Sequence, residues 1–590
     1  MKVVLSTLNA KYIHSSLALK YLKAVCDVVP FNIVIKEYTI NNELLAILGE
    51  LYGEHPDIIG FSCYIWNIDM TLKLAGLIKK VLPQAVIILG GPEVTYDPLQ
   101  LMQTNPYIDY VVQGEGEKVL PSLLYALKTN TTITDLEGVS FREKGVISVG
   151  SPQVVADLNA IPFPYRDADM EQLKDKIIYY ESTRGCPFSC QYCLSSATSG
   201  VRFFDLQRVY RDLTFFIQHN VKQVKFVDRT FNAKKEHFFP ILRFLAKQDC
   251  RTNFHFEIAV DLLDDEVLTF LQEVPDGRFQ FEIGIQSTYE PTLKKIARHN
   301  NWPKITNHVT QIVANQNIHV HLDLIVGLPY ESYTQFGHSF NDVYRLQPQM
   351  LQIGFLKMLK GAGLRQMIEE CGYVFLEEAP YEILSNNSLT YGEVRKLKIL
   401  EELFNQVYNS GRFKYTLEIL IWLHGGDAFR FYHDLAAYWE EQNLHLIAHS
   451  NKSIYKYLFD FCSVYHENRI EICREFLKFD ILMNEKGAKQ AEFLSWNQEQ
   501  WREEKSEFWR DMDKVRNYIS DYRFTTWRDI KKKYHIEVFS IDLVAYKKKA
   551  GEFIHKEFPV LFSYTQDRTT YQAIADADFK QKEGRGYCAL

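Results

Sequence analysis

Three absences narrow the class of protein before any motif is considered. No run of about 18 apolar residues occurs, so no membrane-spanning helix is predicted. The first residues, MKVVLSTLNAKYIHSSLALKYL, contain no long apolar segment and no small-residue cleavage site, so we expect no signal peptide. Positive charge is not in excess, because 67 Lys and Arg stand against 74 Asp and Glu. This balance argues against a chain coated with positive charge for nucleic acid, but it allows a local basic face.

The length and the cysteine content suggest a multidomain protein in a reducing compartment. At 590 residues the chain is too long for one hydrophobic core, and we expect about three or four domains. Ten cysteines without a secretion signal favour the cytoplasm, where clustered thiols usually bind metals or take part in catalysis. No internal repeat and no low-complexity tract is found.

The first domain, expected over 1–150, alternates short apolar runs with amphipathic segments. The expected strands cover 3–8, 32–40, 57–65, 85–91 and 110–117. Their apolar residues are continuous rather than alternating, as in parallel strands that are covered on both faces. The pattern therefore predicts a doubly wound α/β sheet whose ligand crevice lies at the carboxyl ends of the strands.

A proline-bearing linker over 151–175 precedes a second run of β and α segments over 176–372. The expected strands cover 176–183, 223–228, 253–260, 279–287, 319–329 and 350–359. Six parallel strands with intervening helices predict a partial (βα)6 barrel, with its chemistry at the carboxyl ends of the strands. The remainder, 373–590, is rich in aromatic residues and is expected to be mainly helical, for example over 395–413.

Three cysteines within eight residues mark the start of this barrel. Cys186, Cys190 and Cys193 have the spacing C-x3-C-x2-C, and no fourth Cys or His follows at the spacing of a zinc knuckle. Three thiolates could hold three irons of a [4Fe–4S] cluster and leave one iron open for a small molecule. The spacing alone also allows a zinc site, or buried or redox-active thiols.

The whole segment ESTRGCPFSCQYCLSS, with the aromatic Tyr192, closely resembles the signature of radical S-adenosylmethionine (SAM) enzymes. The resemblance implies that the open iron binds the amino and carboxylate groups of SAM. One electron, from a flavodoxin- or ferredoxin-type donor, then cleaves SAM to methionine and a 5′-deoxyadenosyl radical. DLIVGLP, which includes Gly327, resembles the family segment that flanks the adenine, and EIGIQS, which ends at Ser287, resembles the one that faces the ribose and methionyl group.

Several polar residues of the barrel are candidates for contacts with SAM or substrate. By resemblance, Asp228 lies near the methionyl amine or the substrate, with a helix N-cap as the structural alternative. Glu257, Glu282 and Gln286 fall on strand positions that could point into the barrel, because buried carboxylates need polar partners; exposure at the strand ends is the alternative. Arg298 could pair with the SAM carboxylate, since a guanidinium fork suits that group.

His319, His321 and Asp323 alternate on one strand face and resemble a set of metal ligands. With no further sequence signal for a second metal, packed and hydrogen-bonded strand residues are the favoured interpretation.

Glycines end three strands of the first domain, in GFSCYIWN, GGPE and GEGE. Glycine at a strand end permits either close approach to a ligand or a tight turn. The segment after the first strand, STLNAKYIHSS, contains no glycine, which disfavours NAD or FAD. In this order, before such a barrel, the three ends resemble the cobalamin-binding domain of cobalamin-dependent radical SAM enzymes.

That resemblance implies cobalamin without a lower axial His, because the motif D-x-H-x-x-G is missing. His14 and His55 are expected to be surface or helix-start residues. Tyr64 and Trp66 are candidates to cover the lower face of cobalamin, with core packing as the alternative. The other cobalamin contacts implied by the resemblance are Asn9, Ser62, Gly90, Gly91, Glu93, Gly114 and Glu117.

The C-terminal region carries two weaker signals. Lysines 531–533 and 547–549 lie among aromatic residues, a composition that can contact phosphates and bases or can simply form a solvated face. Near the end, Tyr587 and Cys588 could donate a hydrogen atom to a radical, with a loose tail as the alternative.

We therefore expect a cobalamin- and SAM-dependent radical enzyme with a [4Fe–4S] cluster, most simply a methyltransferase acting on an unactivated carbon. The C-terminal domain would select the substrate, either a small molecule or a tRNA nucleoside. One alternative is a non-methylating enzyme that acts on tRNA, for example by reducing epoxyqueuosine. A second alternative is a non-catalytic cobalamin sensor.

Overall fold

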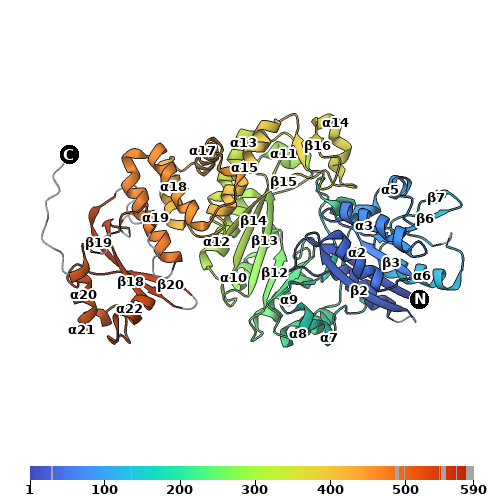
Figure 1. The fold of residues 1–590 in the computed structure, drawn as a ribbon, viewed down its shortest axis with the longest axis horizontal. Helices are drawn as coiled ribbons and strands as arrows, with labels where there is room; N and C mark the ends of the chain where they lie inside the picture. Colours follow the sequence, from blue (N-terminus) through green and yellow to red (C-terminus); the bar gives the residue numbers. More distant parts are fainter. Residues whose placement is uncertain are drawn as a thin grey trace. The chain divides into compact units, whose positions relative to one another are not determined.

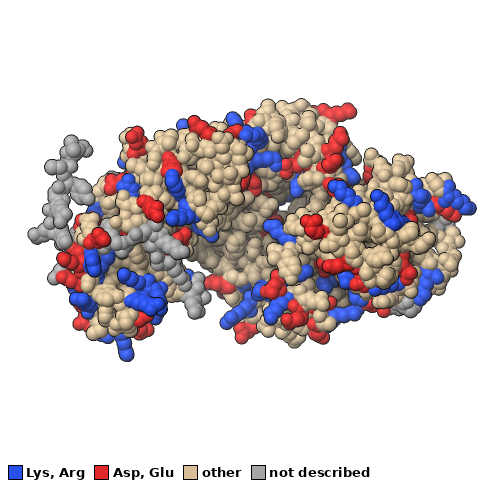
Figure 2. Space-filling view, viewed as in Figure 1, with Lys and Arg blue, Asp and Glu red and all other residues tan. Residues whose placement is uncertain are grey.

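The structure is a computed structural model, and it describes residues 1–27, 31–133, 136–197, 200–485, 491–496, 499–543, 545, 553–565 and 568–579. The chain divides into two compact units, Met1–Val394 and Arg395–Leu590. In the described part of the chain, no helix is both long and apolar enough to cross a bilayer. Acidic and basic side chains are interspersed on the face shown in Figure 2, in keeping with the balanced composition.

The first unit begins with a sheet of order β2-β1-β3-β4-β5-β6-β7, in which the first five strands are parallel (Figure 1). These five confirm the predicted parallel strands and are β1 (Lys2–Asn9), β2 (Asn32–Thr39), β3 (Ile58–Ser62), β4 (Val86–Gly90) and β5 (Tyr110–Val112). Two antiparallel strands that the sequence analysis did not predict, β6 (Val139–Glu143) and β7 (Val146–Ser148), extend the edge.

Helices cover both faces of this sheet, as a doubly wound fold requires. On one face lie α2 (Leu44–Gly53) and α3 (Ile68–Val81), whose Leu51 and Leu74 pack with Val4 and Ile59. On the other lie α1 (Leu17–Cys26) and α6 (Gly116–Thr129), which bury Leu19 and Leu123 against Val3. The shorter helices are α4 (Pro92–Thr95), α5 (Pro98–Thr104) and, in the linker, α7 (Asp167–Leu173).

The second sheet of this unit has six parallel strands in the order β15-β14-β13-β12-β11-β8, which confirms the predicted partial barrel. The strands are β8 (Ile178–Tyr180), β11 (Gln223–Phe226), β12 (Asn253–Glu257), β13 (Phe279–Gln286), β14 (His319–Val326) and β15 (Met350–Phe355). The intervening helices are α8 (Leu206–Gln218), α9 (Lys235–Ala246), α10 (Asp265–Gln272), α11 (Glu290–Lys295), α12 (Trp302–Asn315) and α13 (Tyr333–Tyr344).

The barrel strands alternate in polarity, because successive side chains point to opposite faces of a sheet. In β12, Phe254 and Phe256 are fully buried among aromatic neighbours, whereas His255 and Glu257 face the other way. β13 repeats the pattern, with Phe279 and Phe281 on the packed face. The inner face of the barrel is therefore polar.

Smaller elements complete the first unit. β9 (Thr183–Gly185) and β10 (Val201–Phe203) form an antiparallel pair on either side of the cysteine segment. A Cβ on Gly185 would lie 2.1 Å from the Gly200 carbonyl oxygen, so the close pairing at this position requires glycine. The last elements are α14 (Ile368–Cys371), β16 (Val374–Phe375) and β17 (Ile383–Ser385).

The second unit is mainly helical, as predicted, but it also contains a three-stranded antiparallel sheet that was not predicted. Its helices are α15 (Tyr391–Val407, which begins in the first unit), α16 (Lys414–Leu423), α17 (Ala428–Glu441), α18 (Asn451–Tyr465), α19 (Ile470–Asn484), α20 (Arg502–Arg510), α21 (Met512–Arg516) and α22 (Trp527–Lys533). Its strands are β18 (Tyr534–Ile541), β19 (His555–Tyr564) and β20 (Thr569–Ala573). α19 supplies Phe476 and Phe479 to the core beneath the sheet.

Candidate cofactor-binding site

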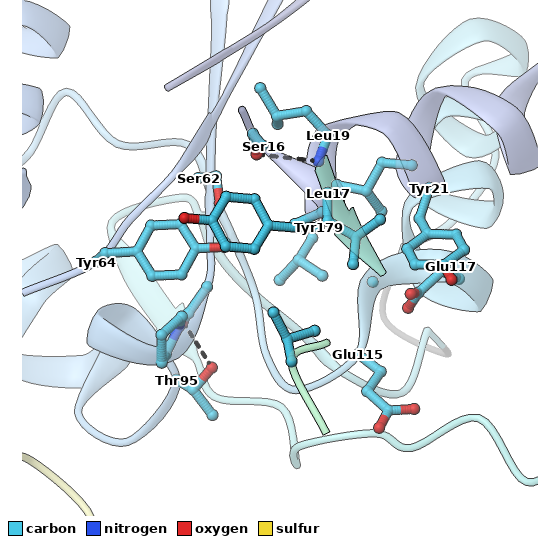
Figure 3. Close-up of a pocket in the computed structure, with 18 of the residues that line it drawn as sticks. Ser16, Leu17, Leu19, Tyr21, Ser62, Tyr64, Thr95, Glu115, Glu117 and Tyr179 are labelled. Carbon is cyan, nitrogen blue, oxygen red and sulfur yellow. Dashed lines mark hydrogen bonds between the residues drawn. The ribbon is translucent and has the colours of Figure 1, made fainter. Parts of the chain in front are cut away.

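A cavity of about 780 Å³ lies in the first unit, between the strand ends of its two sheets (Figure 3). The first sheet lines it with the ends of β1, β3, β4 and β5, and the barrel lines it with β8 and the segment that follows. The cavity is thus at the carboxyl ends of parallel strands, where α/β folds bind ligands. Its volume is in the upper part of the range for small-molecule pockets, so it can accept a large cofactor.

Most of the residues that the resemblance assigned to cobalamin lie on the cavity wall. They are Asn9, Ser62, Tyr64, Trp66, Gly90, Gly91, Gly114 and Glu117. Glu93 is off the wall and buried, where its carboxylate accepts a hydrogen bond from Tyr381 and lies 3.4 Å from the Lys360 ammonium. These eight residues therefore line the cavity, whereas their contacts with cobalamin stay predictions.

Two of the glycines have backbone positions that other residues would strain. Gly91 has a φ of 107°, and a Cβ there would lie 2.5 Å from the Cys63 carbonyl oxygen. Gly114 has a φ of 77°, and a Cβ would lie 2.2 Å from the Gln153 carbonyl oxygen. The absence of a side chain at Gly91 and Gly114 therefore allows the backbone of Cys63 and Gln153 to pack closely against them at the cavity rim. It does not serve to make room for a ligand.

Tyr64 and Trp66 form a stacked pair on the wall. Their ring centroids are 4.5 Å apart with an interplanar angle of 4°, and the Trp66 indole donates a hydrogen bond of 3.2 Å to the Leu8 carbonyl. Burial raises the pKa of Tyr64, so its phenol is neutral at physiological pH. The pair offers a rigid aromatic surface to the cavity.

The segment without glycine after β1 also reaches the cavity. His14, expected to be a surface or helix-start residue, lies on the wall just before the N-cap of α1, and its Nδ1 is 2.6 Å from the Tyr179 hydroxyl of the barrel. Burial and the nearby Lys11 lower the pKa of His14. Ser16 caps α1 by accepting from the Leu19 amide, so that the first turn of α1 faces the cavity (Figure 3).

An ion-pair network on the wall connects the two sheets. Arg184, only 12% exposed, lies 3.3 Å from Glu115 and 2.5 Å from Glu117, both at the start of α6 in the first domain, and 2.7 Å from Glu181 of the barrel domain. Arg202, which lies on β10, pairs with Glu115 at 2.5 Å. A guanidinium shared among three carboxylates compensates charges that burial would otherwise make costly.

Asp228 is fully buried and does not face the cavity. Its carboxylate accepts hydrogen bonds from the Ser182 amide at 3.0 Å, the Ser182 hydroxyl at 2.8 Å and the Thr183 hydroxyl at 2.6 Å. It is not a helix N-cap either, because α9 is capped by Lys234. Burial raises the pKa of Asp228 to about 6. Asp228 fixes the segment immediately before the cysteines.

The three cysteines lie on the loop between β9 and β10, each beside a polar group. The Cys186 thiol is 3.4 Å from the Thr230 hydroxyl, the Cys190 thiol is 3.7 Å from the Arg298 guanidinium, and the Cys193 thiol is 3.3 Å from the Ser195 hydroxyl. The Arg298 guanidinium donates to Cys190, and the Ser195 amide donates to Cys193 at 3.4 Å. Hydrogen bonds from such donors stabilise thiolates, as the chemistry of an iron–sulfur cluster requires. The donor set therefore fits three thiolate ligands.

Arg298, in the segment between α11 and α12, supports the cysteine loop. Besides its contact with Cys190, it donates to the Tyr192 hydroxyl at 3.1 Å, to Asn300 at 3.1 Å and to the Gly284 carbonyl. These bonds occupy both ends of the guanidinium and bind the loop to β13. Pairing with the SAM carboxylate stays a prediction, and Arg298 is not on the cavity wall.

Of the other barrel residues assigned to SAM, Glu257 lies on the cavity wall. Burial, reinforced by the nearby Glu282 carboxylate, raises the pKa of Glu257 to about 7. Gln286 has a φ of 70° at an irregularity in β13, and its role is untested. Glu282 lies deeper in the barrel, where it pairs with Lys225 at 2.9 Å.

Ser287 and Gly327 are also off the wall. The buried Ser287 hydroxyl donates to Glu331 at 2.6 Å. Gly327 has a φ of 90°, and a Cβ there would lie 1.8 Å from the Ile383 side chain, so packing requires glycine. Tyr587 and Cys588 lie outside the described residues.

Several wall residues were missed by sequence reasoning, namely Tyr21, Thr95, Tyr96, Glu115, Tyr179, Glu181, Thr183, Arg184 and Arg229. Three of them, Glu181, Thr183 and Arg184, belong to the ESTRGC segment. Their place directly before the first cysteine was an available signal, because that segment leaves the carboxyl end of the first barrel strand.

Three family models match consecutive parts of the chain. The B12 binding domain matches residues 3–124, the Radical SAM superfamily matches 180–343, and a protein family of unknown function, DUF4080, matches 369–562. The first two matches coincide with the two sheets that enclose the cavity. The chain therefore carries a B12 binding domain followed by a radical SAM domain, and the cofactors of these two domains are cobalamin, SAM and a [4Fe–4S] cluster.

Individual relatives resemble about half of the chain. The 2-(S-pantetheinyl)-carbapenam-3-carboxylate methyltransferase of Streptantibioticus cattleyicolor is 31% identical over 298 residues, which cover 48% of this chain and 44% of the relative. The cobalamin-dependent radical SAM methyltransferase TokK of Streptomyces tokunonensis is 29% identical over 48% and 44% of the two chains. The matches thus span less than half the length of these curated relatives.

The solved structure of OxsB, a cobalamin-dependent S-adenosylmethionine radical enzyme with aqua-cobalamin and SAM bound, has a similar fold. The two structures superpose with a TM-score of 0.59 over 81% of each chain, at 14% sequence identity. At this identity the likeness establishes the fold alone.

Proposed function

We propose that this protein is a cobalamin-dependent radical SAM methyltransferase that acts on an unactivated carbon. The observation that carries the proposal is a cavity that is bounded by the strand ends of both cofactor domains. When bound, the cluster and SAM would supply a 5′-deoxyadenosyl radical, and cobalamin would supply the methyl group. The names of the two methyltransferases that resemble about half of this chain support the same reaction class.

The residues of the chain would position these groups and exclude water. Cys186, Cys190 and Cys193 would hold the cluster, and Asp228 would fix the segment that leads to them. The strand ends at Asn9, Ser62 and Gly90 would contact cobalamin, and the stacked Tyr64 and Trp66 would cover its lower face.

Arg184 would keep the two domains closed around the cavity, because it binds carboxylates of both. Glu257, with its raised pKa, could exchange a proton with a ligand near neutral pH. A flavodoxin- or ferredoxin-type protein in the cytoplasm would donate the electron.

The alternatives receive less support. No relative or family match described above indicates tRNA modification. Of the basic residues that suggested it, Lys531, Lys532 and Lys533 are exposed on the short helix α22, whereas lysines 547–549 lie outside the described residues. A sensor would not need the cysteine loop with its polar partners.

An anaerobic assay with SAM that carries a trideuterated methyl group tests the proposal. The reduced, reconstituted enzyme is incubated separately with a small-molecule extract and with total tRNA, and the products are analysed by mass spectrometry. The proposal predicts a molecule in the extract that gains a trideuteromethyl group. A product that loses oxygen, with no deuterium gained, would instead identify a reductase, and label in tRNA would reassign the substrate class.

A further inference from the structure

The inner face of the barrel holds a polar cluster that the proposed reaction does not use. It consists of Lys225 on β11, His255 on β12, Glu282 on β13, and His321 and Asp323 on β14. Strand register brings them together, because Lys225 pairs with His255 and Glu282 pairs with His321. The side chains of His255 and His321 are only 8% and 7% exposed, and those of Glu282 and Asp323 are 20% and 18% exposed.

Three of these side chains converge in the manner of metal ligands. One possible ligand atom each from Glu282, His321 and Asp323 lies within 4.8 Å of the other two. The His321 Nε2 and the Asp323 Oδ1 are 3.0 Å apart, yet neither is aligned with a hydrogen-bond partner among the described residues. Two ligand atoms at this separation are close enough to bind one ion.

Without a metal, His321 and Asp323 would form a close ion pair with poor hydrogen-bond geometry. The His321 side chain is more than nine-tenths buried, where a polar atom without a well-aligned partner is costly. The same misalignment recurs for His255, whose Nε2 is 2.9 Å from Glu282 without a hydrogen-bond geometry. A bound cation would satisfy the converging atoms at once.

The surrounding charges permit such an ion. Lys225 donates to the Glu282 Oε2 at 2.9 Å, which leaves the other carboxylate oxygen available. The lysine then serves as an outer hydrogen bond that orients a ligand carboxylate, a common arrangement around metal sites. Two carboxylates, Glu282 and Asp323, neutralise a divalent cation, and Glu257 is close enough to interact electrostatically with both.

We propose that Glu282, His321 and Asp323 bind one divalent transition-metal ion inside the barrel, separate from the iron–sulfur cluster. One imidazole and two carboxylates suit Mn²⁺, Fe²⁺ or Zn²⁺ rather than Ca²⁺ or Mg²⁺. Three protein ligands leave coordination positions open, so the ion can bind an oxygen atom of a molecule in the barrel. The site is one strand from the cavity wall, since Glu282 pairs in register with Glu257.

The ligand set differs from the trio that the sequence suggests. His319 has the same strand parity as His321 and Asp323, but it is exposed at the start of β14 and is not part of the convergent group. Glu282 takes its place from the neighbouring strand. His319 is therefore a natural control, because it is a histidine of the same strand face that binds no metal in this proposal.

Electron paramagnetic resonance with Mn²⁺ tests the site on the anaerobically reconstituted protein, with cluster and cobalamin present. We expect about one equivalent of Mn²⁺ to bind and to show coupling to one imidazole nitrogen in pulsed spectra. His321→Ala should remove that coupling, and His321→Ala and Asp323→Asn should each weaken binding at least about tenfold. His319→Ala should bind Mn²⁺ like the wild type.

Two further measurements keep the outcome interpretable. Cluster absorbance and cobalamin content of each variant report whether it is folded, and Zn²⁺ competition repeats the affinity comparison without relying on Mn²⁺. A Cys190→Ala protein should still bind Mn²⁺ with the nitrogen coupling, so failure of the radical chemistry and failure of the metal site are distinguishable. Absence of stoichiometric Mn²⁺ and Zn²⁺ binding by the wild type, or equal binding by folded His321→Ala, would overturn the proposal.

Discussion

The two parallel sheets of the first unit obey the same topological rule but present opposite chemistry to their ligands. The first sheet meets the cavity with glycines, small polar residues and the Tyr64–Trp66 stack. The barrel lines the cavity with Glu181, Arg184 and Glu257. Its inner face also carries the converging side chains of Glu282, His321 and Asp323.

The difference follows from what each sheet has to bury. The strands of the first sheet are apolar on both faces because helices cover both, so only their ends can contact a ligand. The barrel strands are apolar on one face only, and the other encloses a polar interior. A large, mostly organic cofactor suits the first kind of edge, and charged reactants suit the second. Changes that target one edge should therefore affect one cofactor selectively.

Cys190→Ala should have the largest effect. The cluster would lose one of three thiolate ligands, so the brown absorbance and all SAM cleavage should disappear, whereas cobalamin binding should persist. Absorbance spectra and 5′-deoxyadenosine formation measure the two properties. Cys250→Ala, which alters a thiol outside the loop, should retain both, and a Cys190→Ala protein with an intact cluster would refute the cluster assignment.

Arg184→Ala should destabilise the contact between the cobalamin-binding domain and the barrel domain. Removing the guanidinium leaves Glu115, Glu117 and Glu181 with less compensation in a buried setting, which typically costs about 3–5 kcal/mol. Denaturant unfolding measures the loss. Arg166→Ala, which removes the pair of a 57% exposed arginine with Asp27, should cost at most about 1 kcal/mol. Equal losses in the two variants would show that the network does not hold the sheets together.

Gly114→Ala should perturb only the cavity wall that the first sheet forms. The new Cβ would meet the Gln153 backbone, so we expect a cost of about 3 kcal/mol and weaker cobalamin binding, with the cluster retained. Gly145→Ala is the matched control, because its φ is also positive, at 83°, but nothing lies within 4 Å of the added Cβ. It should cost only about 1 kcal/mol. Cobalamin titration and thermal unfolding compare the two.

Glu257→Gln should have the smallest effect, and one that depends on pH. A folded-state pKa of about 7, raised from 4.5, means that the wild type gains stability from protonated Glu257 at low pH and loses it as the pH rises through 7. Glutamine does not titrate, so the variant should gain up to about 2 kcal/mol relative to the wild type between about pH 5 and about pH 8. Urea unfolding at both pH values checks this, and a difference independent of pH would contradict the assignment.

The sequence was sufficient to predict the elements that carry local signals. Continuous apolar runs predicted the five parallel strands of the first sheet, and the strand positions of Glu257 and Glu282 allowed them to point into the barrel. The cysteine spacing marked the loop after the first barrel strand. The strand β18 was missed, although YHIEVFSI alternates, because helical patterns surround it.

Contacts across long chain separations could not be predicted in the same way. His14 meets Tyr179 across 165 positions, and Arg184 meets Glu117 across 67. Such pairs depend on how the two sheets pack against each other, which no local periodicity encodes. The same reason explains why Asp228 could be placed near the site but not assigned to the Ser182–Thr183 segment that it holds.

The formation of methylcobalamin on the protein tests the central claim most directly. The reconstituted enzyme, holding cob(I)alamin, is mixed anaerobically with SAM that carries a trideuterated methyl group, and the cobalamin is analysed by mass spectrometry. The proposed methyltransferase predicts trideuteromethylcobalamin and an equal amount of S-adenosylhomocysteine, without any need to know the substrate. Bound cobalamin that stays unmethylated while the reduced cluster cleaves SAM would contradict methyl transfer and indicate a non-methylating radical enzyme.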